Sequence, residues 1–340
     1  MFLQQESAHL MATLAGAALF KVIALSYVEK NHRKRFQKPI TEQIGTVANL
    51  FIYPVKSCGV TEVTEADCTS VGLQFEGLTD RHWMIIDENM QVLTMKEAPR
   101  LTLIKCISFG DSIRLTAPGM TPLELSKNPD IRSHDRQVKI MCQQAIPIVH
   151  CGSQAESWIS TFLQRPARIV YSCSDLGVRD VFDRKRKWPN SARKGDSTIF
   201  SYLTSYLVCT SASLNLINGQ LTSPVSMVNF RPSIVVENTE PFDEDMWTEV
   251  KIGEHVLFHS VEPCRRCTIT TIDPVTAKSR DDRQPLELLK SFRCRQPYGT
   301  APIFGLYLSL DIAGHIRVGD PVLVLKADDS KFTFQSSSYF

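Results

Sequence analysis

Short apolar segments separated by turn residues dominate the first half of the chain after residue 43. They are of strand length, rich in β-branched and apolar side chains, and bounded by Gly, Pro, Asn or Asp. The expected strands are residues 44–55, 81–88, 91–95, 101–109 and 136–142. Repeated short strands at this spacing predict a β-barrel or a β-sandwich.

A helical pattern follows at residues 155–163, where apolar side chains recur at the period of an α-helix. Ser153 with Glu156 three residues later has the spacing of a capping box, which predicts that this helix begins there. Residues 167–173 predict another strand. The stretch from Ser174 to Asp196 is polar and basic, so we expect a long surface loop.

Strand and helix patterns are mixed in the second half of the chain, so the sequence predicts an α+β fold with a strong β component. Thr210 or Ser211 is the expected N-cap of a helix, and Gly253-Glu254 is the expected turn of a hairpin. The expected strands are residues 205–210, 229–237, 303–312 and 315–325, with a hairpin at 249–262, and the expected helices are 210–221 and 284–292.

The N-terminal segment Leu10–Val28 is apolar over about 19 residues, near the length that spans a bilayer as a helix. It contains one charge, Lys21, and a basic flank from Lys30 to Lys38 follows it. Positive residues after the span predict a membrane anchor that leaves the rest of the chain in the cytosol. A cleaved secretory signal, a mitochondrial presequence and an amphipathic surface helix are the alternatives.

Composition and charge exclude several classes of protein. The 340 residues are 43% hydrophobic and 22% charged, which is typical of a globular protein and not of a disordered one. The net charge of +2 gives no reason to expect a nucleic-acid partner, and the basic charge is concentrated at residues 32–35 and 184–187. The 10 cysteines are scattered in a long chain, so we expect reduced, mostly buried thiols and not a disulfide scaffold.

Cys264-Arg265-Arg266-Cys267 is the sharpest local signal for chemistry. Two thiols at this spacing can share a metal or form a redox disulfide. No second pair of Cys or His ligands for structural zinc is found, and a β-branched run follows where a thioredoxin-like motif would open a helix. The arginines favour a thiolate and offer forked donors to an oxyanion. Two incidental buried cysteines beside an exposed arginine pair are the alternative.

Three further motifs place cations at the ends of expected strands. Lys56-Ser57 follows the first strand, Asp80-Arg81 opens the next, and Arg231 precedes the strand at 233–237. Ammonium, hydroxyl and guanidinium groups in such places can bind phosphate. A plain turn at Lys56-Ser57 and ordinary surface ion pairs at the two arginines are the alternatives.

Together these segments resemble one family, the MOSC-domain proteins that carry an N-terminal MOSC β-barrel, and within it the amidoxime-reducing branch. The resemblance covers residues 44–326 and rests on the order of IYPVKSCGV, GLTDRHWMIID, LTMKEAPRL, NFRPSIVV, PFDEDMW, EPCRRCTITTIDP, PIFGLYLSL and VGDPVLVL. It implies an anchor with a basic flank at 1–40, an N-terminal MOSC β-barrel domain at 41–165, a MOSC domain with a β-barrel core and flanking helices at 170–326, and a C-terminal tail at 327–340.

The resemblance also implies a Mo-molybdopterin cofactor whose metal has one protein ligand, Cys267, the second cysteine of its motif. The implied contacts to the pterin and its phosphate are Lys56, Ser57, Arg81, Thr204, Ser205, Arg231, Arg265, Arg266 and Tyr307. The chain departs from the family pattern in two places. The segment FSYLTSYLV around Thr204 lacks the usual Asp, and Thr248 replaces the Asp that usually follows the Trp.

By the same resemblance, the chain is expected to reduce N-hydroxylated compounds such as amidoximes and hydroxylamines to amidines and amines. Electrons would come from NADH through cytochrome b5 reductase and cytochrome b5, at the outer mitochondrial membrane, with the catalytic domain facing the cytosol. A sulfurtransferase that acts on the molybdenum cofactor through a cysteine persulfide is the alternative enzyme. A membrane-tethered protein that only carries or stores the cofactor is the non-enzymatic alternative.

Overall fold

The computed structural model describes residues 42–133, 136–139, 144–182 and 190–327. The expected anchor at Leu10–Val28, the basic runs at 32–35 and 184–187, and nearly all of the C-terminal tail lie outside these residues. Within the described ranges, no helix combines the length and the apolar character needed to cross a membrane.

A closed ring of strands forms the largest sheet. Its strand order is β16-β15-β19-β18-β17-β21-β1, and β1 pairs again with β16, which closes the ring and leaves β2 outside it. The strands are β1 (Glu42–Ile52), β2 (Thr61–Val63), β15 (Tyr206–Thr210), β16 (Ile234–Glu237), β17 (Trp247–Ile252), β18 (Val256–Arg265), β19 (Ile303–Ile312) and β21 (Pro321–Lys326). Closure pairs the backbone donors and acceptors of every strand in the ring on both sides.

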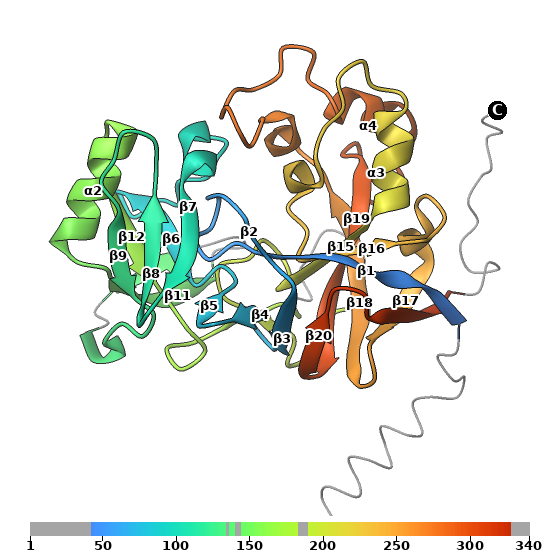
Figure 1. The fold of residues 1–340 in the computed structure, drawn as a ribbon, viewed down its shortest axis with the longest axis horizontal. Coiled ribbons are helices and arrows are strands. Elements are labelled where there is room, and N and C mark those ends of the chain that lie inside the picture. Colours follow the sequence, from blue (N-terminus) through green and yellow to red (C-terminus); the bar gives the residue numbers. More distant parts are fainter. Residues whose placement is uncertain (1–41, 134–135, 140–143, 183–189, 328–340) are drawn as a thin grey trace, which may run out of the picture. The chain divides into compact units, whose positions relative to one another are not determined.

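Smaller antiparallel sheets occupy most of the first half of the described chain (Figure 1). Their orders are β10-β11-β12-β6, β7-β8-β9, β20-β3-β4-β5 and β13-β14. Their strands are β3 (Glu65–Thr69), β4 (Gly72–Phe75), β5 (Leu78–Thr79), β6 (Trp83–Asp87), β7 (Lys105–Phe109), β8 (Ser112–Thr116), β9 (Leu123–Ser126), β10 (Arg136–Lys139), β11 (Ala145–His150), β12 (Ala167–Tyr171), β13 (Arg179–Asp180), β14 (Ser197–Thr198) and β20 (Gly314–Arg317).

Among the described residues helices are few and short, so the predicted β-rich α+β class is confirmed. The α-helices are α2 (Ser153–Leu163), α3 (Ser211–Asn218) and α4 (Leu286–Phe292). The 3-10 helices are η1 (Pro99–Leu103), η2 (Ile131–Ser133), η4 (Met227–Phe230), η5 (Asp243–Met246) and η6 (Thr268–Thr271).

The two halves of the described chain exchange strands. β1, near the N-terminal end, pairs with β16 and β21 of the barrel, while β20, near the C-terminal end, pairs with β3. From Glu42 onward the chain is accordingly one compact unit. The domain limits at 41–165 and 170–326 stay a prediction.

Some local expectations are confirmed and others are wrong. The Thr210 side chain accepts a hydrogen bond from the Ser213 N–H and caps α3, and the hairpin β17–β18 turns at Gly253. The capping box at Ser153 is wrong, because Gly152 is the N-cap, with a φ of 91° that glycine adopts readily, and Ser153 is already helical.

One expected strand and the start of another are also wrong. Residues 91–95 form only an isolated bridge between Val92 and Ile86. Residues 101–103 belong to η1, which has proline, with its fixed φ, in its first turn, so the strand β7 begins only at Lys105.

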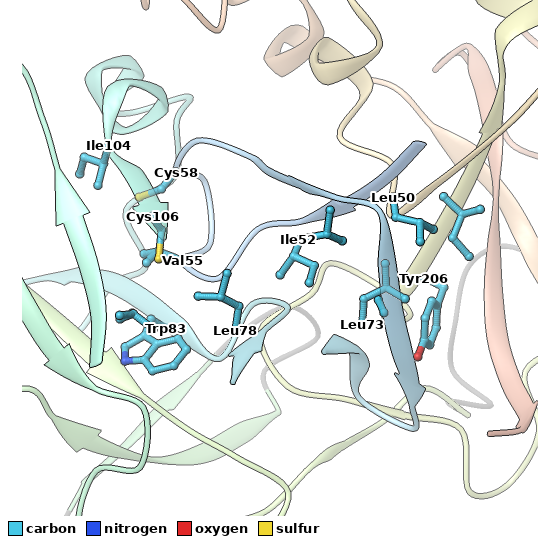
Figure 2. Close-up of a cluster of buried hydrophobic side chains, with 14 of the residues drawn as sticks. Leu50, Ile52, Val55, Cys58, Leu73, Leu78, Trp83, Ile104, Cys106 and Tyr206 are labelled. Carbon is cyan, nitrogen blue, oxygen red and sulfur yellow. The ribbon is translucent and has the colours of Figure 1, made fainter. Parts of the chain in front are cut away.

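The main hydrophobic core links the barrel to the smaller sheets. Leu50 and Ile52 on β1 lie in the same buried cluster as Leu73 on β4 and Trp83 on β6 (Figure 2). The cysteines among the described residues are free, and Cys58, Cys68, Cys106, Cys209 and Cys264 are buried. The described cysteines thus agree with the expectation of reduced, mostly buried thiols.

Candidate functional site

One cavity of about 730 Å³ lies where the turn after β1, the turn before β6 and the ends of β18 and η4 meet. Every site residue that the sequence predicted lines this cavity. They are Lys56, Ser57, Arg81, Thr204, Ser205, Arg231, Arg265, Arg266, Cys267 and Tyr307. Segments far apart in the sequence therefore converge on one pocket.

Lys56 and Ser57 follow β1 in a turn that is tied to the next sheet. The Lys56 N–H donates to the Trp83 carbonyl at 2.8 Å, and its ammonium group donates to the Phe200 carbonyl. Burial, together with the nearby charges of Arg179 and Arg81, lowers the pKa of Lys56 to about 7. An anion in the pocket would oppose this effect and favour the charged lysine.

Arg81 and Asp80 form an ion pair inside the protein, so the alternative of a surface pair is wrong. Asp80 is only 1% exposed, and it also accepts a hydrogen bond from the Tyr53 N–H at 2.8 Å. Burial raises the pKa of the Asp80 carboxyl group, and the charge of Arg81 opposes this. The paired carboxylate fixes the guanidinium group of Arg81 beside the pocket.

Arg231 occupies the strand entrance that the sequence predicted, between η4 and β16. It is not in a surface ion pair: its Nη2 atom is buried and has no hydrogen-bond partner. Burial lowers the pKa of Arg231 to about 10, so it still carries its charge at neutral pH. An unsatisfied buried donor costs about 1–3 kcal/mol, and a bound anion would remove that cost.

Three of the lining residues have a strained backbone. Ser57, Arg81 and Arg231 have φ values of 70°, 55° and 56°, in the left-handed region that residues with a side chain rarely adopt. Such conformations cost on the order of 1–3 kcal/mol and persist where the surrounding structure imposes them, often at functional sites. Here they occur in three turns, far apart in the sequence, that line one cavity.

The two cysteines of the motif have different surroundings. Cys264 is 3% exposed within a hydrophobic cluster, and burial raises the pKa of its thiol. Cys267 is exposed, lines the pocket and is the N-cap of η6. The interpretation of two buried, incidental thiols is therefore wrong for Cys267.

Arg266 is buried, and most of its donors are used within the protein. Its Nε donates to the Phe304 carbonyl at 2.8 Å and its Nη1 to the Phe230 carbonyl at 2.7 Å. Gly305 makes room for it, because a Cβ there would lie 3.3 Å from Arg266 Nη2 and 2.6 Å from Cys209 Sγ. Arg266 therefore ties the turn between Cys264 and Cys267 to β19 and η4.

Thr204, Ser205 and Tyr307 also line the cavity, as does Arg265. The Thr204 hydroxyl donates to the Tyr206 carbonyl at 2.8 Å, and the Ser205 hydroxyl to Thr198 Oγ1 at 3.1 Å. The ring of Tyr307 stacks on that of Tyr202, with centroids 6.4 Å apart. The hydroxyl groups of Thr204 and Ser205 are therefore hydrogen-bonded within the protein, which orders this part of the cavity.

Several residues that shape the site were not predicted from the sequence. The ring of Tyr53 lies under the guanidinium groups of Arg81 and Arg231. The Asn229 amide donates to the carbonyls of Thr270 and Ile272, both at 3.1 Å. Arg179, in the expected surface loop, is 6% exposed and donates to the Ile199 carbonyl at 2.9 Å. Tyr53 and Asn229 lie within the quoted motifs, but no pattern in the sequence marks Arg179.

No group of three or more His, Cys, Asp or Glu side chains that could hold a metal ion occurs within the described ranges. The pocket instead combines one exposed thiol with several cations. A site of this composition suits an anionic ligand, which guanidinium and ammonium groups bind with charge-assisted hydrogen bonds.

Comparisons with known proteins identify two domains and a set of relatives. The MOSC N-terminal beta barrel domain matches residues 44–166, and the MOSC domain matches residues 198–323. Mitochondrial amidoxime-reducing component 1 of Mus musculus is 37% identical over 318 residues, which cover 92% of this chain and 90% of the mouse protein. Mitochondrial amidoxime-reducing component 1 of Homo sapiens is 37% identical, and the match covers 85% of this chain and 86% of the human protein. Mitochondrial amidoxime reducing component 2 of Homo sapiens is also 37% identical, with 91% of this chain and 90% of the human protein covered. The chain therefore belongs to the family of the mitochondrial amidoxime-reducing components, which contain MOSC N-terminal and MOSC domains.

Proposed function

We propose that the chain is a molybdenum-cofactor oxidoreductase that reduces N-hydroxylated compounds, with Cys267 as the protein ligand to the metal. The observation that carries this proposal is the convergence of Lys56, Arg81 and Arg231, from three separate motifs, with the exposed thiol of Cys267 on a single cavity of about 730 Å³. The names of the relatives, which describe amidoxime reduction, support the same reaction.

The side chains fit such a cofactor. Lys56, Arg81 and Arg231 would hold the phosphate of the pterin, and the buried Nη2 of Arg231 is a donor that lacks an acceptor. Cys267 would ligate the metal, because a thiolate is a soft, electron-donating ligand. In this proposal the cations hold the phosphate and the thiol holds the metal.

The proposed reaction removes oxygen from an N–OH group. Two electrons and two protons convert a hydroxylamine into an amine and water, and the molybdenum cofactor supplies this redox chemistry when bound. The protein binds and orients the cofactor and leaves the Cys267 side of the pocket open to a small substrate. We propose NADH as the electron source, through cytochrome b5 reductase and cytochrome b5.

We propose a location at the outer mitochondrial membrane, facing the cytosol. The support is the apolar segment Leu10–Val28 with its basic flank, and the word mitochondrial in the names of the relatives. A membrane tether would concentrate the reductase, cytochrome b5 and this chain on one surface.

Metal analysis and turnover together test the proposal. The purified full-length chain should contain molybdenum and pterin near one per chain, and it should oxidise NADH in the presence of benzamidoxime, cytochrome b5 and its reductase. A sulfurtransferase would instead take the outer sulfur of a persulfide donor onto Cys267, which leaves the donor as a thiol, without NADH oxidation. A storage protein would contain molybdenum without turnover, and absence of molybdenum would refute the assignment.

A further inference from the structure

Tyr53 is a buried residue that does not line the pocket, yet it contacts two cations that do. The guanidinium carbon of Arg231 lies 4.2 Å from the centroid of the Tyr53 ring, and that of Arg81 lies 4.7 Å from it. Tyr53 is fully buried, and its hydroxyl has no hydrogen-bond partner. Its ring, and not its hydroxyl, therefore makes the contacts that matter for the pocket.

The backbone holds this ring in a fixed place. The Tyr53 N–H donates to the Asp80 carboxylate at 2.8 Å, and the Tyr53 carbonyl accepts from the Arg81 N–H, also at 2.8 Å. Arg81 in turn donates to the Arg231 carbonyl at 3.3 Å. Tyr53, Asp80, Arg81 and Arg231 thus form one connected unit at the edge of the cavity.

The two arginines differ in what balances their charge. Arg81 has the Asp80 carboxylate, whereas Arg231 has a buried Nη2 without a partner. The negative face of an aromatic ring attracts a guanidinium group, most strongly where water is excluded. Without that attraction, the Arg231 side chain would relax away from the neighbouring positive charge of Arg81.

We propose that Tyr53 is a positioning residue, whose ring holds the unpaired guanidinium of Arg231 beside Arg81 in readiness for a phosphate group. The inference rests on the proposed function, since it assigns the phosphate of the cofactor to this pair. The ligand chemistry is a phosphomonoester, because two guanidinium groups that line one cavity can donate to different oxygens of one phosphate. Binding then requires little rearrangement of the two side chains.

The test measures the affinity of the full-length chain, freed of cofactor, for inorganic phosphate at pH 7, and the pterin content of the chain as purified. Tyr53→Phe keeps the ring and should bind phosphate within about twofold of the unaltered chain. Tyr53→Leu removes the ring and should bind about tenfold more weakly. Its pterin content should fall in parallel.

Phe162→Leu is the matched control. Phe162 is also buried beneath an arginine, with the guanidinium carbon of Arg100 at 4.6 Å from its ring centroid. Unlike Arg81 and Arg231, however, Arg100 does not line the cavity. This variant should be less stable and bind phosphate normally. Equal weakening in Phe162→Leu and Tyr53→Leu would overturn the inference, because a general loss of packing would then explain both.

A second series removes the question of whether Tyr53→Leu folds. Phenylalanine carrying one, two or three fluorine atoms at position 53 keeps nearly the same shape while the negative face of the ring weakens stepwise. Phosphate affinity should fall with each fluorine, whereas an affinity that stays level or rises would overturn the inference. Arg231→Ala separates the two proposals. If Arg231→Ala binds phosphate as well as the unaltered chain does, the proposed cofactor site is refuted. If Arg231→Ala binds phosphate weakly but Tyr53→Leu binds it normally, only the role of Tyr53 is refuted.

Discussion

Cys264 and Cys267 are three residues apart, but Cys264 is 3% exposed in the core beside Tyr307, while Cys267 is exposed at the cavity. The strand β18 ends between them, at Arg265, so the chain turns before Cys267 and presents it to the pocket. Two thiols with the same chemistry are therefore not equivalent.

The first prediction follows from this difference. Cys267→Ser should abolish benzamidoxime reduction while most pterin stays bound, because the phosphate contacts of Lys56, Arg81 and Arg231 persist. Cys264→Ser should keep substantial activity and lose some stability. NADH oxidation and X-ray absorption at the molybdenum edge measure these effects. Equal inactivation of both variants, or an unchanged number of sulfur ligands in Cys267→Ser, would refute the role of Cys267.

The second prediction separates the two arginines. Arg231→Ala should lower pterin occupancy, since a charge-assisted contact contributes about 1.5–3 kcal/mol, and it should leave the midpoint of thermal unfolding of the cofactor-free chain nearly unchanged. Arg81→Ala should also destabilise the fold, by up to about 3–5 kcal/mol, because the buried Asp80 carboxylate loses its ion-pair partner.

The control for these two variants is Arg114→Ala. Arg114 also pairs with a carboxylate, that of Glu124 at 2.7 Å, but this pair lies at the surface and away from the cavity. Pterin content and the midpoint of unfolding should both stay close to those of the unaltered chain. Full pterin content in Arg231→Ala and Arg81→Ala would remove both residues from the site.

The third prediction concerns Lys56 and pH. Burial and neighbouring arginines lower its pKa to about 7, and a bound anion would raise it, so anion binding should be coupled to proton uptake. The affinity of the cofactor-free chain for sulfate, whose charge is constant in this range, should therefore fall as pH rises from 6 to 8 (about threefold or more). Calorimetric titration measures this. In Lys56→Met the pH dependence of sulfate affinity should be lost. If sulfate affinity changes with pH equally in Lys56→Met and in the unaltered chain, the prediction is contradicted.

The fourth prediction concerns His259, a buried barrel residue whose ring nitrogens lie 3.0 Å from the carboxylates of Asp196 and Asp311. Burial acts to lower the pKa of His259, but both hydrogen bonds raise it above its usual value. The stabilisation should be complete below about pH 6.5 and lost as pH rises through the higher pKa of the folded state.

Thermal unfolding between pH 5 and 9 tests this. The difference in midpoint between the unaltered chain and His259→Gln should be largest at low pH and shrink as pH rises. Arg193, which donates to Asp311 at 2.8 Å, would keep part of the link at high pH. His255→Gln, at an exposed position four residues earlier, is the control and should show no such trend. If the difference in midpoint between the unaltered chain and His259→Gln grows as pH rises, the prediction is wrong.

The fifth prediction concerns the N-terminal segment. A chain that begins at residue 40 keeps β1, which starts at Glu42, and should fold in solution and retain the cofactor. The full-length chain should fractionate with mitochondrial membranes and resist alkaline carbonate. Its release by carbonate would argue against a spanning helix.

Local elements could be predicted from the sequence, because they depend on neighbouring residues. A strand-length apolar run bounded by turn residues predicted β1, Gly253-Glu254 was expected as a hairpin turn, and Thr210 or Ser211 was expected to cap its helix. Each of these signals is contained in a short stretch of chain, where backbone preference and side-chain period act directly. The residues that line the cavity were indicated differently, by the resemblance of ordered motifs over residues 44–326 to one family.

Only the tertiary structure decided what each of those residues touches. The sequence was equally consistent with Asp80-Arg81 at the surface, and burial of Asp80 appears only when β1 and β6 come together around it. Likewise Arg266 was expected to offer its donors to a ligand, but the carbonyls of Phe230 and Phe304 occupy two of them. Two contacts join residues that are far apart in the sequence. β1 pairs with β16, and Tyr53 contacts Arg231, which follows it by 178 positions. Pairings over such distances depend on the packing of the whole barrel, which no local pattern records.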